Sequence, residues 1–253
     1  MPKNPLVTVI MPAYNAAGFI QQAIESVLCQ TVSDLELLVI DDGSVDETRQ
    51  IVEQLCARDC RVHLLINEKN LGAGGTRNRG LEMSKSPYTA LLDSDDYWKP
   101  QMLEALIGRL EQTGADLAYC SYALVDEQGE KVCNDFIVPE ETDFEHSAVR
   151  NVISCSSVVF ARKVVDRYRF PVNVYHEDIA LWFQMLREGI VARGVPEVLA
   201  AYRQRADSKT AGKLKSAVRR WSVYRKHLGL PFLKSAGFMV RYACYGLQKY
   251  KRI

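Results

Sequence analysis

The sequence lacks any apolar run near the roughly 20 residues that a helix needs to span a bilayer. Its N-terminal stretch also lacks the long apolar segment of a secretory signal, so we expect a cytoplasmic protein. No internal repeat and no low-complexity segment interrupts the chain. With 253 residues and 47% hydrophobic side chains, it can bury one large core, or one core and an appendage, and it is not a disordered protein.

Cysteine pairs with metal-binding or redox spacing are absent. The seven cysteines are odd in number, and no two are separated by only two residues. Most of them lie in apolar surroundings, and Cys56 and Cys60 fall four apart on a predicted helix. This pattern favours free thiols over disulfides or a zinc site.

Acidic residues are missing from the C-terminal part of the chain. From Ser208 to Ile253 there are 12 Lys and Arg and no Asp or Glu, which leaves 20 basic and 31 acidic side chains before Ser208. An acidic body of this kind is a poor nucleic-acid binder. The basic tail carries many aromatic residues and fits an anionic membrane surface; the alternative is a basic helix pair packed on the rest of the chain.

The first half of the chain alternates short apolar runs with helical patterns, which is typical of strand–helix–strand units and a parallel sheet. The predicted strands are residues 6–11, 35–40, 61–66 and 88–92, and the predicted helices are 16–29, 44–58, one starting near Gly74, and 100–112. Ser44 and Glu47 have the spacing of a capping box.

The second half is less regular. Strands are predicted at residues 117–125, 131–138, 156–160 and 195–202, with a hairpin turn at 126–129 and a helix at 179–187. Two further helices, 213–227 and 232–250, are separated by Gly229 and Pro231. The sequence therefore predicts an α/β fold with a mostly parallel, Rossmann-like sheet flanked by helices and a basic helical C-terminal extension.

Polar residues follow three of the predicted strands, at residues 12–15, 41–44 and 93–96. The carboxyl ends of parallel strands meet at one edge of a sheet, where open α/β sheets bind ligands. The cluster Asp93, Asp95 and Asp96 needs a counter-ion, and Mg²⁺ or Mn²⁺ takes one or two carboxylates together with phosphate oxygens. The alternative is a polar strand-to-helix loop with a capping aspartate, a role we expect for Asp96.

A nucleotide site accounts for the three strand ends together. The ring of Tyr14 can lie against a flat base, and Asp42 can accept a hydrogen bond from a base N–H group. A metal at Asp95 can hold a diphosphate. Taken alone, Asp41 and Asp42 also fit a simple turn before a helix.

Four segments in order resemble the hallmarks of the inverting family-two glycosyltransferases of the GT-A fold. They are residues 7–15 (VTVIMPAYN), 41–46 (DDGSVD), 70–80 (NLGAGGTRNRG) and 92–98 (LDSDDYW). The resemblance covers roughly residues 5–210. More narrowly, the chain is similar to bacterial enzymes that build surface polysaccharides such as teichuronic acid or O-antigen.

The resemblance implies roles for particular residues. The nucleoside, expected to be uridine, would be held by Pro12, Ala13, Tyr14, Asn15 and Asp42. Arg77 would lie near the nucleotide, Asp93 and Ser94 near the ribose and diphosphate, and Asp95 would bind the metal. For Arg77 the alternative is a solvated charge on a helix.

A carboxylate pair at residues 177–178 precedes an apolar helical segment. Relatives place an acidic pair here, with its second carboxylate facing the acceptor, so Asp178 is the candidate general base and Glu177 the second choice. The alternative for Asp178 is a capping carboxylate favoured by the helix dipole.

One departure from the family pattern concerns the segment after residue 202. Many relatives carry a histidine where this chain has Arg205. Arg203 or Arg205 can neutralise the diphosphate directly, because a guanidinium pairs well with phosphate oxygens; a solvated loop is the alternative.

The resemblance implies an enzyme that moves a sugar from a nucleotide-sugar donor to a growing lipid-linked oligosaccharide at the inner face of the plasma membrane. The expected organisation is a catalytic domain over residues 1–211, with a donor half (1–113) and an acceptor half (114–211), and a tail over 212–253. A sugar-nucleotide sensor or scaffold and a nucleotidyltransferase are the alternatives. The sequence gives no indication of oligomeric state.

Overall fold

The computed structural model describes residues 4–204 and 213–250. Within them, nine strands form one mixed sheet. The strands are β1 (Val7–Ala13), β2 (Leu35–Asp41), β3 (Val62–Ile66), β4 (Tyr88–Leu91), β5 (Tyr97–Trp98), β6 (Leu117–Val125), β7 (Glu141–Thr142), β8 (Val158–Ala161) and β9 (Ala192–Arg203). The helices are α1 (Ile20–Leu28), α2 (Thr48–Cys56), α3 (Gly72–Met83), α4 (Met102–Thr113), α5 (Phe144–Val149), α6 (Arg162–Arg167), α7 (Glu177–Arg187), α8 (Lys213–Ser222) and α9 (Phe232–Tyr250).

The strand order is β3-β2-β1-β4-β8-β6-β9-β5, with β7 pairing to β9. The first four strands in this order are parallel, whereas β8 runs antiparallel to both β4 and β6. The register pairs Ala13 with Asp41, so β1 and β2 end side by side. The antiparallel β8 begins beside the end of β4, where Leu91 pairs with Val158. Segments far apart in the sequence therefore meet at one sheet edge.

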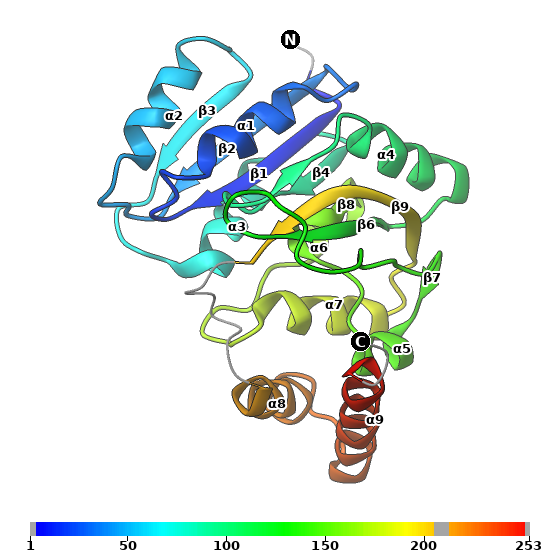
Figure 1. The fold of residues 1–253 in the computed structure, drawn as a ribbon. Helices are drawn as coiled ribbons and strands as arrows, with labels where there is room; N and C mark the ends of the chain where they lie inside the picture. Colours follow the sequence, from blue (N-terminus) through cyan, green and yellow to red (C-terminus); the bar gives the residue numbers. More distant parts are fainter. Residues whose placement is uncertain (1–3, 205–212, 251–253) are drawn as a thin grey trace.

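Helices cover both faces of the sheet (Figure 1). Buried side chains of α1, α2 and α4 form the core on one face, and those of α3, α6 and α7 form the core on the other. The predicted α/β class and mostly parallel first half are confirmed.

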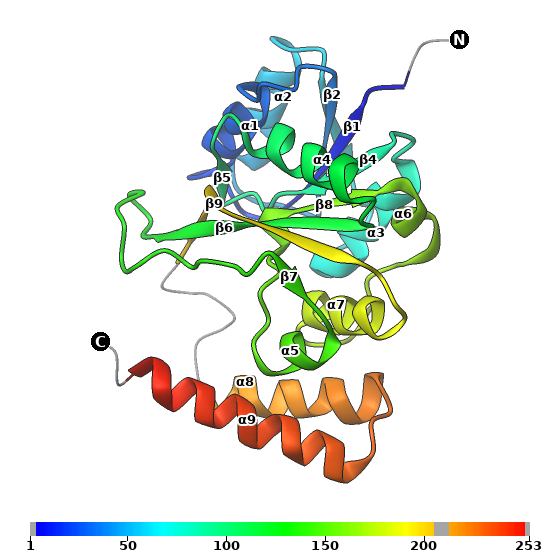
Figure 2. The same cartoon turned by 90° about the vertical axis from the view of Figure 1, so that its right-hand side faces the viewer.

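The C-terminal helices pack on this second core. Figure 2 shows α8 and α9 running side by side against the layer that contains α5 and α7. Tyr224 stacks on Phe183 with ring centroids 6.0 Å apart, and Phe238 meets Phe144 edge-on at 5.6 Å. Both Tyr224 and Phe238 are buried. The described part of the tail therefore shares the core of the sheet, as expected for a basic helix pair packed on the rest of the chain.

None of the helices in the described ranges is both long and apolar enough to cross a membrane.

Three predicted details of the fold are wrong. Residues 131–138 form no regular strand, because only Val125–Lys131 and Tyr122–Phe136 are bridged. Between these bridges β6 advances three residues and its partner five, so the extra residues break the ladder. The turn at residues 126–129 does form.

The other two errors concern helix starts. The first helix begins at Ile20 instead of residue 16. Residues 16–19 form a turn in which the N–H of Phe19 donates to the carbonyl of Ala16, and the N–H groups of Ala16 and Ala17 donate to Thr48 Oγ1 and Asp46. Ser44 forms no capping box, because its hydroxyl accepts from the N–H of Asn15.

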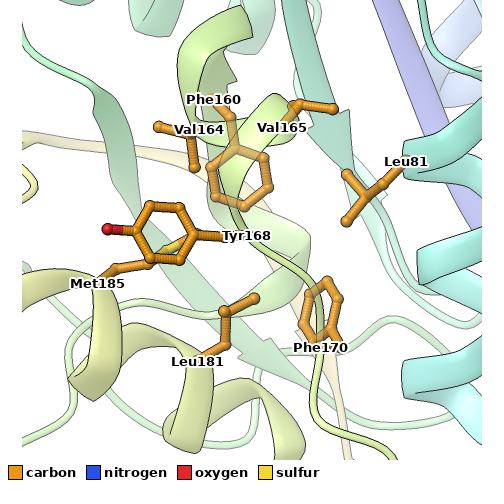
Figure 3. A pocket seen from close by; sticks show the side chains of 8 residues that line it. All are labelled: Leu81, Phe160, Val164, Val165, Tyr168, Phe170, Leu181 and Met185. Atoms are coloured by element: carbon orange, nitrogen blue, oxygen red, sulfur yellow. The ribbon is translucent and has the colours of Figure 1, made fainter.

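The core beneath α7 is close-packed. Side chains from α3, β8, α6 and α7 converge here (Figure 3). The void left between them has a volume of about 10 Å³. Its lining includes Leu81, Phe160, Phe170 and Met185. A void of this size with an apolar lining stays dry, so it is a packing gap and not a ligand site.

Gly80 lies on the side of α3 that faces the sheet, so a substitution there measures how closely the helix approaches the strands. A Cβ on Gly80 would lie 2.5 Å from Ile10 Cγ2 and 3.0 Å from Ile40 Cδ1. Gly80→Ala is expected to lower the free energy of unfolding by about 1–3 kcal/mol in urea titrations, because the methyl overpacks this contact. Gly108→Ala on α4, where nothing lies within 4 Å, is the control and is expected to raise it by about 0.5–1 kcal/mol. Equal stability of the two variants would contradict the close approach.

Candidate active site at the carboxyl edge of the sheet

The loops after β1 and β2 are tied together at the sheet edge. Asn15 lies in the left-handed region at φ 49°, and its side-chain Oδ1 accepts from the N–H of Val45 at 2.9 Å. The N–H of Asp42 donates to the carbonyl of Ala13 at 2.8 Å. Tyr14, between these anchored residues, is 53% exposed. The structure thus presents the Tyr14 ring to solvent from a fixed backbone.

Asp41 and Asp42 both face protein groups. The buried Asp41 carboxylate accepts from Arg49 Nε at 2.6 Å. Asp42 accepts from Asn67 Nδ2 and the N–H of Leu71, both at 2.7 Å, and from the N–H of Gly72 at 2.9 Å. A carboxylate offers about four acceptor positions, so Asp42 fixes the start of α3 and keeps about one position for a ligand.

Arg77 connects two carboxylates from distant parts of the chain. Its guanidinium is buried, and it contacts Asp93 Oδ1 at 2.6 Å and Glu177 Oε1 at 3.2 Å. The Phe170 ring lies 5.4 Å beneath it. Burial opposes the charge, but Asp93 and Glu177 outweigh it and hold the pKa of Arg77 well above its ordinary value. Arg77 is therefore no solvated helix charge: it joins the end of β4 to the start of α7.

The expectation that Asp96 caps a helix is wrong. Asp96 is buried and accepts from Ser156 Oγ at 2.5 Å and from the N–H of Arg203 at 2.7 Å. The helix that follows begins only at Met102. Burial, followed by the charges of Asp95 and Asp93, raises the pKa of Asp96 well above its usual range. Its carboxyl group ties residues 93–96, the aspartate loop, to the turn before β8 and to β9.

Arg203 is largely engaged by protein groups. Its guanidinium donates to the backbone carbonyls of Asp95 (2.8 Å), Asp126 (3.0 Å) and Glu127 (2.8 Å), and to Gln22 Oε1 at 2.7 Å. Four of its five N–H groups are used in this way. Arg203 thus braces the aspartate loop against the 126–129 turn. Arg205 lies outside the described residues.

Glu177 and Asp178 open α7, directly after His176 at φ 59°. Asp178 is half-buried. Burial, with a further contribution from the neighbouring Glu177 charge, raises the pKa of Asp178 to about 6, and the charges of Arg77 and Asp93 also act on it. His176, at the N-cap of α7, makes no side-chain cap, and the Asp178 carboxylate interacts with the backbone N–H of Ile179 in the first turn. The structure therefore brings the predicted base close to the donor-side residues.

Several residues at this edge had no signal in the sequence. Ser156 accepts from the N–H of Asp93 at 3.1 Å as well as donating to Asp96, and its carbonyl accepts from Trp98 Nε1 at 2.6 Å. The buried thiol of Cys155 lies within the field of Arg77, Asp93 and Asp178; burial is the main reason that its pKa is raised. Only the pairing of β8 with β4 reveals these neighbours.

Asp95 and Asp93 are the residues able to hold a divalent metal at the end of β4. Asp95 is half-buried, and its backbone is fixed by Arg203. Among the described residues, no group of three or more His, Cys, Asp or Glu side chains gathers as a protein-only metal cage. A donor set of one or two carboxylates fits Mg²⁺ or Mn²⁺, which leave their other positions to water and substrate phosphate.

The sheet carries carboxylates at the ends of β2 and β4, beside the loop of Tyr14 and Asn15 after β1, and a second carboxylate pair lies at the start of α7. This is the architecture of a GT-A glycosyltransferase. The profile described as Glycosyl transferase family 2 matches residues 8–132. The chain belongs to this family, because it is 34% identical to TuaG of Bacillus subtilis (strain 168) over 97% of this chain and 98% of the relative. The name of TuaG describes a glycosyltransferase of teichuronic acid biosynthesis.

Three further matches agree. The chain is 32% identical to WfgD of Escherichia coli, a UDP-Glc:alpha-D-GlcNAc-diphosphoundecaprenol beta-1,3-glucosyltransferase, over 97% of this chain and 95% of the relative. Among solved structures, S. aureus TarS 1-349 in complex with UDP-GlcNAc matches with a TM-score of 0.73 at 18% identity, over 94% of this chain and 71% of that one. The mannosyltransferase PcManGT of Pyrobaculum calidifontis, in complex with GDP-Man and Mn²⁺, matches with a TM-score of 0.66 at 20% identity, over 90% and 64%. These structures establish the fold.

The raised pKa of Asp178 predicts a pH-dependent effect on stability. The pKa lies at about 6 against an ordinary 3.8, so the ionised carboxylate disfavours the folded state, fully above pH 6 and not at all below pH 3.8. Asp178→Asn is therefore expected to raise the free energy of unfolding at pH 8 by about 1–3 kcal/mol. At pH 4 this increase in the free energy of unfolding should nearly vanish, because Asp178 is then protonated in the folded wild-type protein.

Urea titrations at both pH values measure this difference. Asp166→Asn on α6, an exposed carboxylate paired with Arg162, is the control and should give no gain at pH 8. An Asp178→Asn gain of the same size at pH 4 and pH 8 would contradict the raised pKa.

Proposed function

We propose that this enzyme transfers a sugar, with inversion, from a UDP-linked donor to a growing lipid-linked oligosaccharide in surface polysaccharide synthesis. The proposal rests chiefly on the ion pairs of Arg77 with Asp93 and Glu177. Through them, one guanidinium contacts a carboxylate on the predicted sugar-donor side and another on the predicted acceptor side. The relatives WfgD and WfaP, whose names describe transfer from UDP-Glc to a diphosphoundecaprenol-linked GlcNAc, support the donor and acceptor classes.

The donor is held at the carboxyl ends of β1, β2 and β4. Pro12, Ala13, Tyr14 and Asn15 form the wall for the nucleoside, with the exposed Tyr14 ring lying against the base. The remaining acceptor position of Asp42 takes a base N–H group. Ser94 and Asp93 lie toward the ribose and diphosphate.

Several groups balance the negative charge of the donor diphosphate. Arg77 contributes its guanidinium beside Asp93. Arg203 acts mainly by fixing the backbone of Asp95, and not by direct contact with the phosphates as first predicted. Arg205 is the candidate for direct phosphate contact. Asp95 holds Mg²⁺ or Mn²⁺, which, when bound, stabilises the charge that develops on the departing diphosphate.

Asp178 accepts the proton of the acceptor hydroxyl as the new bond forms. A pKa of about 6 leaves it ionised at neutral pH while making it a stronger base than an ordinary aspartate. Glu177 is committed to Arg77, so it serves chiefly to orient the site and to raise the pKa of Asp178. One base and no covalent intermediate give inversion at the anomeric carbon.

Replacing the base tests this assignment. Asp178→Asn is expected to lower kcat by ~10²-fold or more without changing donor affinity, because the proton loses its acceptor while the donor contacts remain. Initial rates with a panel of UDP-sugars, and UDP binding by calorimetry, measure the two effects. Asp166→Asn is the control and should keep wild-type turnover. Wild-type turnover in Asp178→Asn would exclude Asp178 as the base.

Metal dependence has its own test. Removing divalent ions with EDTA is expected to abolish transfer, and adding Mn²⁺ should restore it in the wild type. In Asp95→Asn the Mn²⁺ concentration for half-maximal rate should rise by about ten-fold or more, because a carboxylate ligand is lost. Transfer that continues in EDTA would contradict metal use.

The tail binds the enzyme to the anionic inner face of the plasma membrane, through one side of α9. Phe232, Leu233 and Val240 there are 61%, 83% and 63% exposed. Leu233 and Val240, seven residues apart, lie on the same side of the helix. The cations that follow them, Lys234 and Arg241, pair with Glu145 on α5 at 2.8 Å and 4.0 Å, so they hold α9 in place with this side outward. A second copy on this face would bring two acid-free basic segments together, which favours lipid over a dimer.

Point substitutions on α9 test membrane binding better than a truncation, since removing the tail would uncover Phe183 and Phe144. Leu233→Glu combined with Val240→Glu is expected to weaken sedimentation with phosphatidylglycerol vesicles about ten-fold or more, because two apolar contacts are lost and negative charge is added. Val132→Glu, at an exposed valine outside the tail, is the control. Undiminished binding of the double variant would exclude this face.

A further inference from the structure

An exposed aromatic ring stands beside the predicted base. In the described part of the chain, three aromatic side chains are more than half exposed: Tyr14 at 53%, Phe232 at 61% and Tyr175 at 71%. Tyr14 lies in the proposed nucleoside wall, and Phe232 on the proposed membrane face of α9. Tyr175 lies three residues before Asp178, and three residues span at most about 11 Å. The most exposed of the three rings is therefore close to the group that is expected to act on the acceptor.

The loop between α6 and α7 that carries Tyr175 is fixed at both ends. At its start the N–H of Phe170 donates to Asn78 Oδ1 at 2.7 Å, and Asn78 Nδ2 donates to the Phe170 carbonyl at 2.8 Å. At its end Glu177 pairs with Arg77. Asn78 and Arg77 both belong to α3, so the loop is held against the helix that borders the donor side.

The backbone of this loop directs the Tyr175 ring outward. Asn173 and His176 lie in the left-handed region, at φ 62° and 59°, which is uncommon for residues other than glycine and recurs at functional sites. Val174 packs against the core, whereas Tyr175 next to it is exposed. A large ring is thus presented to solvent from a backbone whose shape is defined.

One face of the Tyr175 ring is covered by the tail. The guanidinium of Arg219, on α8, lies 4.5 Å from the ring centroid. Arg219 makes a further interaction besides this contact, so its position behind the ring is restrained. A cation over an aromatic face is attracted by the electrons of the ring and limits the orientations of the ring in turn. Because most of Tyr175 is nevertheless exposed, its accessible surface is mainly the opposite face and the ring edge.

We propose that this opposite face of Tyr175 binds a pyranose ring of the sugar acceptor by stacking. The inference rests on the proposed function, since it takes Asp178 as the base that activates the acceptor hydroxyl. A pyranose whose hydroxyl groups are mostly equatorial has a flat face of C–H groups, and the electron-rich face of an aromatic ring attracts their hydrogens.

Stacking at this position suits the reaction. It orients the sugar through its apolar face and leaves the hydroxyl groups at the rim of the sugar ring free to reach Asp178. A sugar ring is also uncharged, so the carboxylates at the start of α7 do not repel it. Tyr175 would thus serve the acceptor sugar as Tyr14 serves the base of the donor.

Calorimetry on the full-length protein, with UDP and Mn²⁺ at saturation, tests the inference. The probes are decyl-diphospho-GlcNAc and decyl diphosphate, which lacks the sugar. Tyr175→Ala is expected to weaken binding of the GlcNAc probe about ten-fold, and to leave the binding of decyl diphosphate and, in a separate titration, of UDP unchanged. Tyr175→Phe should bind the GlcNAc probe as the wild type does, because the ring is kept. Tyr175→Leu should lose most of the affinity, because leucine is apolar but presents no flat face.

Val172→Ala removes an exposed apolar side chain from the same loop and is the matched control. An equal loss in Val172→Ala, or full affinity in Tyr175→Leu, would reduce the effect to general apolar contact and overturn the inference. So would wild-type binding of the GlcNAc probe by Tyr175→Ala, or a loss of UDP binding, which would assign the ring to the donor. These results leave the proposed function intact. A wild-type protein that binds UDP, but binds the GlcNAc probe no more tightly than decyl diphosphate, contradicts the lipid-linked GlcNAc acceptor and overturns both proposals.

Discussion

The buried guanidinium of Arg77 is the contact on which the site depends. A charge at this depth persists because two carboxylates neutralise it, and these come from the end of β4 and the start of α7, 84 residues apart at Asp93 and Glu177. Removing either partner leaves a buried charge incompletely paired, which is far costlier than losing a surface ion pair. The bridge therefore fixes the distance between the donor-side loop and the helix that presents Asp178.

The three aspartates of the aspartate loop have different partners in the structure and therefore different roles. Asp93 pairs with Arg77, Asp96 turns inward to Ser156 and the backbone of Arg203, and Asp95 has its own backbone held by the Arg203 side chain. The carboxyl group of Asp96, whose pKa is raised by burial, thus serves the fold. This leaves Asp95 and Asp93 as the pair suited to a metal and a diphosphate, a role that stays a prediction.

Regular features of the first half were predictable because their signals are local. Apolar runs gave β1 to β4, and polar residues after them marked the edge that carries the site. Long-range features were not predictable: β8 inserts antiparallel between β4 and β6, and only this places Ser156 beside Asp93. Likewise the spacing of Ser44 and Glu47 predicted a capping box, but the nearby loop after β1 took the Ser44 hydroxyl instead. The packing of Tyr224 and Phe238 into the core also required knowledge of α5 and α7.

The central claim is that one carboxylate, Asp178, activates the acceptor for a single displacement at the anomeric carbon. The most direct test is the configuration of the bond that the enzyme makes. With an α-linked UDP-sugar donor, the proton coupling at the new anomeric centre, measured by NMR on the purified product, distinguishes the two outcomes. The account predicts a β-linkage. An α-linkage would require retention, and would contradict the role given to Asp178.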